Sequence, residues 1–237
     1  MYDLFIYERV MQQGTHFHSG GASVAPNGLT RIKDTKMNQF IAPVQLERST
    51  QLLNHGPVTL ITSASGAARN VMAASWVMPL DFEPPKIIVV MDSKTLTREL
   101  VNKSGVFGVQ LPGKQFLEQT LAVGSTSGRN VDKFYEFNLD TFKGKEIDVP
   151  MLGGCIAWLE CKVIPDQSQR HDIIIGEIVS AYADSRIYSN NRWHFGRTDE
   201  NRTAHYVAGG NFFLTGQEIS MDQHLVEMMA PQMAEHQ

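Results

Sequence analysis

The sequence predicts a mainly β fold, a barrel with helical elaborations, on three observations. Short segments with alternating or fully apolar residues, typical of strands, recur along most of the chain. The few segments with a helical pattern do not alternate regularly with strands, as βαβ units would require. The chain has 237 residues and is 42% hydrophobic, which is enough to bury a sizeable core in one domain.

The first regular elements are expected between residues 49 and 91. A capped start and a closing glycine predict one or two helical turns at 49–56. Apolar segments at 58–63 and 70–77 flank a Ser-Gly turn and predict a β-hairpin. The Asp-Phe-Glu-Pro-Pro sequence at 81–85 predicts that strand pairing stops, and the apolar run at 86–91 predicts a buried strand.

The later elements follow the same two patterns. In chain order they are a helix at 95–104, a strand at 106–111, a helix at 114–123, and strands at 155–164 and 172–183. The span between 123 and 155 is rich in Gly, Lys and Asp and predicts a loop. Cys155 and Cys161 are six residues apart on one strand, which separates them by roughly 20 Å, too far for a disulfide. We expect both to be core thiols on one face.

The chain is expected to have three parts. Residues 1–36 are turn formers without helical or strand period and predict an N-terminal arm. That arm is either an extension or an untranslated stretch, with Met37 as the alternative start. The barrel is expected at 37–215, and residues 216–237 predict a tail or a short amphipathic helix.

Charge and hydropathy exclude several classes of protein. The net charge of −4 does not favour electrostatic binding to nucleic acid or to an anionic membrane surface. The chain has no apolar run of the roughly 20 residues that a membrane span needs, and its N-terminus lacks the basic start of a signal peptide. We therefore expect a cytoplasmic protein with no nucleic-acid or membrane partner.

The common catalytic motifs are absent from the sequence. It contains no phosphate-binding loop of the Gly-x-Gly-x-x-Gly or Gly-x-x-x-x-Gly-Lys-Ser/Thr type. It also contains no His-Glu-x-x-His, Cys-x-x-Cys or Gly-x-Ser-x-Gly. We therefore do not expect a common hydrolase or zinc enzyme, and no metal site is predicted.

The strongest local signal is a strand that runs directly into a helix after Asp92. The first helical turn carries the hydroxyls of Ser93, Thr95 and Thr97, with Lys94 beside them. Free N–H groups at a helix start, hydroxyls and an ammonium group together suit a phosphate. Ordinary helix capping is the alternative on local grounds.

Two weaker signals accompany it. The small residues Ala73, Ala74 and Ser75 would let a flat ring approach the backbone of a strand, although a tight strand crossing would also explain them. His171 begins an apolar strand, where it could orient or protonate a ligand or be an ordinary surface histidine.

Taken together, these segments resemble the flavin reductase-like family of FMN-binding split β-barrels. The matching segments, in the family's order, are 70–77, 82–85, 93–100, 105–112, 127–134 and 171–178, within a match from about 44 to about 213. The resemblance implies a closed, six-stranded, Greek-key-like barrel and a homodimer. The sequence departs from the family pattern at Ala73, where many members have Thr, and at Asn130, where Asp is frequent.

The resemblance also implies roles for particular residues. Those expected to contact the isoalloxazine and ribityl groups are Asn70, Val71, Met72, Ala73, Ala74, Ser75 and Trp76. Those expected around the phosphate are Asp92, Ser93, Lys94, Thr95 and Thr97. Ser127, Gly128 and Arg129 would lie near the flavin or close the site across the dimer interface, and His171 would border the nicotinamide or substrate.

The implied function is an NAD(P)H:flavin oxidoreductase that transfers hydride to flavin N5. Its cofactor would be FMN, with FAD as the alternative, and its co-substrate NADH or NADPH. Reduced flavin or electrons would pass to a partner monooxygenase or electron-transfer protein. Two alternatives stay open at this point: an FMN-holding electron carrier without nicotinamide turnover, and a split-barrel binding module for another planar ligand.

Overall fold

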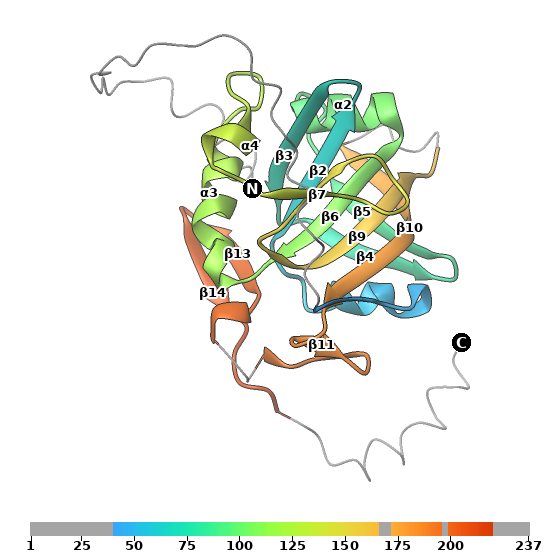
Figure 1. Ribbon diagram of the computed structural model, residues 1–237, viewed down its shortest axis with the longest axis vertical. Helices are drawn as coiled ribbons and strands as arrows, with labels where there is room; N and C mark the ends of the chain where they lie inside the picture. The colour runs from blue at the N-terminus through green and yellow to red at the C-terminus, as the bar shows by residue number, and fades with distance from the viewer. Residues whose placement is uncertain (1–39, 166–171, 196–198, 220–237) are drawn as a thin grey trace.

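The computed structural model describes residues 40–165, 172–195 and 199–219 of the chain (Figure 1). The predicted N-terminal arm at 1–36 and most of the predicted tail at 216–237 lie outside these residues. A large antiparallel sheet forms the centre of the fold, and short helices pack around it. The prediction of a mainly β fold with helical elaborations is confirmed.

Eight strands make up the central sheet. They are β1 (Ile41–Pro43), β2 (Thr59–Ser65), β3 (Ala68–Ala74), β4 (Val77–Phe82), β5 (Pro85–Val90), β6 (Val106–Pro112), β9 (Cys155–Val163) and β10 (Ile173–Asp184). The strands pair in the order β3, β2, β6, β9, β10, β5, β4, with β1 beside β10. Each of these pairs is antiparallel.

The sheet rolls on itself without closing. β3 and β4 stand at opposite ends of the strand order, yet only Ser75 and Trp76 separate them in the chain. This short crossing brings the two edges together, and Val90 N donates to Trp76 O beside it at 3.0 Å. Among the described residues no ladder joins β3 to β4, because β3 pairs with β2 and β4 with β5. The prediction of a closed, six-stranded barrel is therefore wrong, since the sheet is open and has eight strands.

Helices and small strand pairs surround this sheet (Figure 1). The helices are η1 (Leu46–Leu52), α2 (Leu96–Ser104), η2 (Lys114–Phe116), α3 (Leu117–Ser125), α4 (Lys133–Glu136) and η4 (Asp199–Asn201). The small pairs are β7 (Thr141–Lys143) with β8 (Pro150–Leu152), β11 (Tyr188–Ser189) with β12 (Arg192–Trp193), and β13 (Ala204–Ala208) with β14 (Asn211–Leu214).

Two apolar cores lie against the sheet. One contains Leu159 and Cys161 of β9, and the other contains Trp158 with residues near α3, α4 and β7–β8. Successive residues of a strand face opposite sides, so β9 contributes to both cores. The pairing register between β6 and β9 shifts near Pro112. Cys155 therefore packs in the second core, whereas Cys161 packs in the first. Both cysteines are buried free thiols, as expected, but the prediction that they share one face is wrong.

The predicted elements match the observed ones in most places. The hairpin of β2 and β3, strand β5 and helix α2 are confirmed. Pairing does not stop at 81–85, because Asp81 pairs with Lys86 and Phe82 with Pro85 in the β4–β5 hairpin. β4 is an edge strand, where Pro is tolerated because one row of N–H groups needs no strand partner. The span 123–155 is also more than a loop, since it contains α4, β7 and β8.

Candidate functional site

A cleft opens where the chain crosses from β3 to β4. It is an open cleft with both polar and apolar residues along its walls. Three parts of the chain line it: β3 with its exit, the end of β5 with the start of α2, and α3 with its connection to α4. The lining residues are Asn70, Met72, Ala73, Ala74, Ser75, Trp76, Val90, Asp92, Thr95, Leu96, Thr97, Val123, Gly124, Thr126, Gly128 and Lys133.

Helix α2 begins at this cleft with a side-chain cap. Thr95 Oγ1 accepts a hydrogen bond from Arg98 N at 3.2 Å, and the same hydroxyl donates to Asp92 O at 2.8 Å. Backbone bonding begins with Glu99 N, which donates to Thr95 O at 3.2 Å. The N–H groups of Leu96 and Thr97 precede this bond and have no partner in the described part of the chain. Capping and anion binding are thus compatible here, because the cap leaves two N–H groups for an anion.

Arg98 fastens the first turn of α2 to the end of β5. Its guanidinium donates to Met91 O at 2.8 Å and to Asn102 Oδ1 at 3.1 Å. Burial lowers the pKa of Arg98, and the charge of Asp172 opposes that effect. Arg98 therefore serves to hold the helix start in place, since both contacts lie within the protein.

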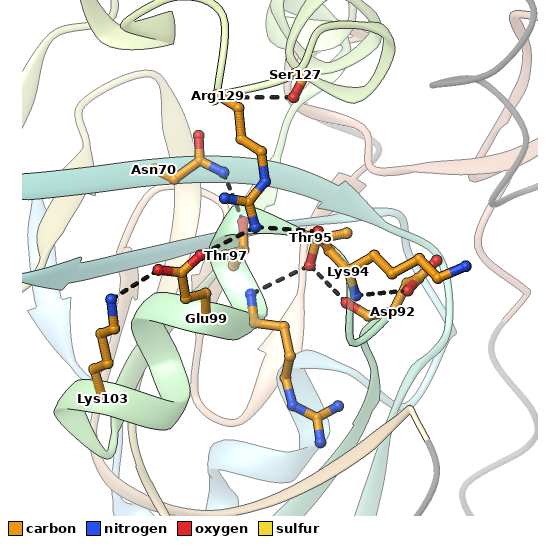
Figure 2. Close-up of polar contacts among 10 residues, drawn as sticks. Asn70, Asp92, Lys94, Thr95, Thr97, Glu99, Lys103, Ser127 and Arg129 are labelled. Carbon is orange, nitrogen blue, oxygen red and sulfur yellow. Dashed lines mark hydrogen bonds and ion pairs between the residues drawn. The ribbon is translucent and has the colours of Figure 1, made fainter.

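Asn70 and Gly128 meet beside this helix start. Asn70 is buried and its Nδ2 donates to Thr97 Oγ1 at 2.9 Å (Figure 2). A Cβ atom at Gly128 would lie 2.0 Å from Asn70 Oδ1, so only glycine fits at this point of the loop. The loop after α3 thus approaches β3 closely enough to wall the cleft.

Arg129 brings a positive charge over the same helix. It forms an ion pair of 3.0 Å with Glu99 Oε2 and donates to Lys94 O at 3.3 Å (Figure 2). Glu99 also accepts from Lys103 Nζ at 2.7 Å, and hydrogen bonds from Lys103 and then Arg129 lower the pKa of Glu99. The Lys94 side chain extends away from Arg129 in Figure 2, so the two cations do not converge.

Lys133 is a buried cation at the other side of the cleft. Its Nζ donates to Val71 O at 3.0 Å and to Val123 O at 2.7 Å. These two carbonyls belong to β3 and α3, so the ammonium group joins the strand to the helix. Only 4% of Lys133 is exposed, and its two hydrogen bonds fix the position of Nζ at the wall of the cleft.

Comparison with known proteins identifies the domain to which this cleft belongs. The family model of the flavin reductase like domain matches residues 53–202, which is more than half of the chain. This chain belongs to the flavin reductase-like family.

Relatives of the domain agree with that assignment. The protein YddH of Escherichia coli K12 is 41% identical over 189 residues, which are 78% of this chain and 99% of that protein. The crystal structure of an FMN-binding domain of a flavin reductases-like enzyme from Shewanella baltica has 39% sequence identity and a TM-score of 0.74, covering 77% of this chain and 97% of that one. The reductase component of a 4-nitrophenol monooxygenase from Rhodococcus opacus is 23% identical over 155 residues, 64% of this chain and 80% of that protein.

The flavin reductase-like domain brings most of the predicted site residues to one cleft. Those that line it are Asn70, Met72, Ala73, Ala74, Ser75, Trp76, Asp92, Thr95, Thr97 and Gly128. Val71 differs, because its side chain is fully buried in the second core and only its backbone faces Lys133. The predicted residue His171 lies outside the described residues.

The other predicted residues surround the cleft without lining it. Ser93 N donates to Asp172 Oδ1 at 2.8 Å, so the start of β10 lies next to the phosphate-binding candidate. Asp92 Oδ1 accepts from Lys94 N at 2.8 Å, and Ser127 Oγ accepts from Arg129 N at 3.3 Å. These bonds shape the two loops that carry the lining residues.

Sequence reasoning missed six of the lining residues, which are Val90, Leu96, Val123, Gly124, Thr126 and Lys133. Lys133 lies within the family-like segment 127–134, but nothing local indicates that a lysine there is buried between two carbonyls.

Among the described residues, no group of three or more His, Cys, Asp or Glu side chains could hold a metal ion. In the same residues no helix is both long and apolar enough to cross a membrane.

Proposed function

We propose that this flavin reductase-like domain binds FMN in the cleft, with the phosphate at the start of α2. The observation that carries this proposal is that the N–H groups of Leu96 and Thr97 have no partner among the described residues. Free N–H groups at a helix start, with the Thr97 hydroxyl beside them, favour the binding of an anion. The macrodipole of α2 adds positive potential at the same point. FMN fits the residues present, because the cleft combines this anion site with the small residues Ala73, Ala74 and Ser75 along β3.

The protein residues would position the cofactor, and the bound FMN would supply the redox chemistry of its flavin ring. Ala73 and Ser75 leave room for a flat ring against β3. Lys133 adds a fixed positive charge to the wall, which favours negative charge on a bound ligand. Gly128 and Arg129 close the loop over the phosphate end.

We propose that the reaction is NAD(P)H:flavin oxidoreduction. Family membership supports an oxidoreductase, and the Rhodococcus opacus relative is the reductase component of a monooxygenase. By analogy a monooxygenase or another electron-transfer protein would receive the electrons. The test is an anaerobic absorption spectrum of the FMN-loaded protein before and after addition of NADH and then NADPH. Bleaching of the flavin band by either nucleotide supports the proposal, whereas retention of the band with both supports an electron carrier.

We propose that His171 borders the nicotinamide or substrate. Its neighbour Asp172 contacts Ser93 N, which brings the start of β10 close to the cleft. His171→Ala should slow NAD(P)H oxidation while FMN affinity stays the same. Unchanged NAD(P)H oxidation and an unchanged flavin potential would remove this role.

We propose that the protein is a homodimer that associates through β4. Four apolar side chains alternate along this edge strand and its start, and each is 48–65% exposed: Trp76, Met78, Leu80 and Phe82. Among the described residues β5 is the only strand that pairs with β4, and such an apolar row on a sheet edge favours association with another chain. Trp76 also lines the cleft, so the interface and the site would be continuous.

The oligomeric state tests this interface. Light scattering after size-exclusion chromatography should give a dimer for the wild type and a monomer for Met78→Lys. Tyr135→Lys is a matched control, because Tyr135 is 81% exposed on α4 away from β4. A monomeric wild type, or a dimer that survives both substitutions, would contradict the proposed interface.

A further inference from the structure

A separate hollow lies at the opposite end of β3 from the proposed FMN cleft. It holds about 470 Å³ of space, a size typical of small-molecule sites. The turn between β2 and β3, the start of β6 and the β7–β8 pair surround it. Among the described residues, none lines both this hollow and the FMN cleft. Ala68 of the hollow and Ala73 of the cleft are separated by roughly 17 Å of strand, so the two sites are distinct.

The hollow exists because β2 and β6 separate. Their ladder ends at the pair Thr62–Gly108, although β2 continues to Ser65 and β6 begins at Val106. If the pairing went on in the same register, Ala64 would lie opposite Val106, but both residues line the hollow instead. In the described part of the chain, this end of β2 pairs with β3 and this end of β6 pairs with β9. The gap is therefore set by the geometry of the sheet.

Gln110 fastens the strands beside the point where this ladder ends. Its Nε2 donates to Thr62 Oγ1 at 2.7 Å, and its Oε1 accepts from Leu152 N at 2.6 Å. The side chain is fully buried and joins β2, β6 and β8. The walls of the hollow are thus held in place, and a ligand would not have to order them on binding.

The inner wall of the hollow is apolar and continues into the second core. Ala64, Val106 and Phe142 line the hollow and pack against that core, and Val149 is a buried member of it. The ring of Phe142 meets the ring of Trp158 edge to face, with centroids 5.6 Å apart. The apolar part of a ligand would therefore lose water and contact a fixed surface.

Two cations and one carboxylate also line the hollow. Arg69 is engaged, because it forms an ion pair of 3.0 Å with Asp132 and lies over the ring of Phe134. Lys143 Nζ lies 3.8 Å from Asp148 Oδ1, too far for a hydrogen bond, and the two side chains are 78% and 93% exposed. An ion pair with this exposure contributes little. Lys143 can therefore turn to another anion without losing a strong partner.

We propose that this hollow binds an amphipathic anion, a small molecule with an apolar body and one carboxylate. The body lies against Val106 and Phe142, and the carboxylate pairs with Lys143. Ser65 and Thr141 add hydroxyl donors to the same lining. An amphipathic cation is disfavoured, because two of the three charged side chains in the lining are positive. The site does not rest on the proposed function, since it has no lining residue in common with the FMN cleft among those described.

Octanoate and octylammonium test the charge preference, because they have the same chain length and opposite charges at pH 7. Calorimetric titration of the full chain should show octanoate binding at least about tenfold more tightly than octylammonium. Equal affinities, or tighter binding of octylammonium, would overturn the proposal.

Lys143→Met tests the partner of the carboxylate. It should weaken octanoate binding by about fivefold or more and reduce the preference over octylammonium. Lys114→Met is the matched control, because Lys114 forms a similar ion pair of 3.6 Å with Glu200 and does not line the hollow. Octanoate affinity that is the same in Lys143→Met as in the wild type would show that the lysine does not hold the carboxylate, and the proposal would be wrong.

Val106→Trp tests the location, because the larger side chain fills the hollow. It should abolish octanoate binding, whereas Val207→Trp should keep it, since Val207 is 51% exposed on β13 and does not line the hollow. Octanoate binding that survives in a folded Val106→Trp variant would place the ligand elsewhere and defeat the proposal.

Titration in the presence of FMN keeps the two proposals distinct. Saturating FMN should leave octanoate affinity unchanged. If FMN abolishes octanoate binding, octanoate occupies the cleft and the hollow is not its site. Absence of FMN binding would defeat the proposed function, while octanoate binding that Lys143→Met weakens and Val106→Trp removes would still support the hollow.

Discussion

Asn70 Nδ2 lies 2.9 Å from Thr97 Oγ1, and this buried hydrogen bond joins β3 to the first turn of α2. The two elements are 27 residues apart in the sequence at this point and supply opposite parts of the cleft. The strand side offers room for a ring, and the helix side offers N–H groups for an anion. One side-chain contact therefore sets the spacing between the two halves of the site.

We expect Thr97→Val to weaken FMN binding about tenfold or more, because it removes both a hydroxyl at the anion site and the acceptor for Asn70. The unpartnered amide should also reduce the free energy of unfolding by about 1–3 kcal/mol. Fluorescence titration with FMN and urea unfolding measure the two effects. Thr97→Ser keeps the hydroxyl and should stay close to wild type; a loss as large as that of Thr97→Val would contradict the role of Oγ1.

Gly128→Ala should lower FMN affinity because its Cβ would lie 2.0 Å from Asn70 Oδ1. The matched control is Gly153→Ala, where the nearest atom to a new Cβ is Asp140 Cβ at 3.5 Å, an ordinary contact. A double-mutant cycle sharpens the test. Adding Gly128→Ala to Asn70→Ala should cost little further affinity, because the clashing amide is gone. Additive losses would show that Gly128 acts through some other contact.

Glu160→Gln should destabilise the protein without changing FMN affinity. The buried carboxylate of Glu160 accepts from the backbone N–H groups of residues 145, 146 and 147 and from Tyr182 OH at 2.9 Å. A glutamine has only one acceptor oxygen, so at least one buried donor loses its partner, at a cost of about 2–4 kcal/mol. Urea unfolding of Glu160→Gln and of the exposed control Glu136→Gln measures this, and equal stabilities would disprove it.

Acid should destabilise the protein through His55. Burial, and to a smaller extent the charge of His205, lower the pKa of His55 from 6.5 to about 4. The unfolded chain therefore binds a proton at a higher pH than the folded one. Stability from the neutral ring is present above about pH 6.5 and is lost as the pH falls towards 4, by about 1–3 kcal/mol. The ring keeps some contact with solvent, which favours the lower end of that range.

Urea unfolding between pH 7 and pH 4 measures this loss. His55→Gln should flatten the fall in stability over that range, and His194→Gln should retain it. If His55→Gln shows the same fall in stability as the wild type, other groups are responsible.

Local patterns predicted the strands that carry the site. Alternation and turn residues indicated the hairpin of β2 and β3, and the apolar run before Asp92 indicated β5. Cap residues indicated the start of α2, where Thr95 does cap the helix. These features depend on residues that are close in the sequence, so they can be predicted from the sequence alone.

Features that depend on distant partners could not be predicted in this way. β4 contains Pro79 and is stable because it pairs with β5 on an edge, a position that local sequence does not reveal. The buried charges of Lys133 and Glu160 are satisfied by backbone groups 10 or more residues away. The same holds for the gap between β3 and β4, since local patterns do not say whether the two edges pair.

The apolar row on β4 has a consequence for the life of the newly made chain. In the described part of the chain, Met78, Leu80 and Phe82 are exposed on an edge strand whose outer backbone has no strand partner there. Until that edge is covered, any extended apolar segment nearby competes for it. Yield of the native protein should therefore fall when synthesis outpaces folding, and precipitation during refolding should decrease when a charge is placed at Met78.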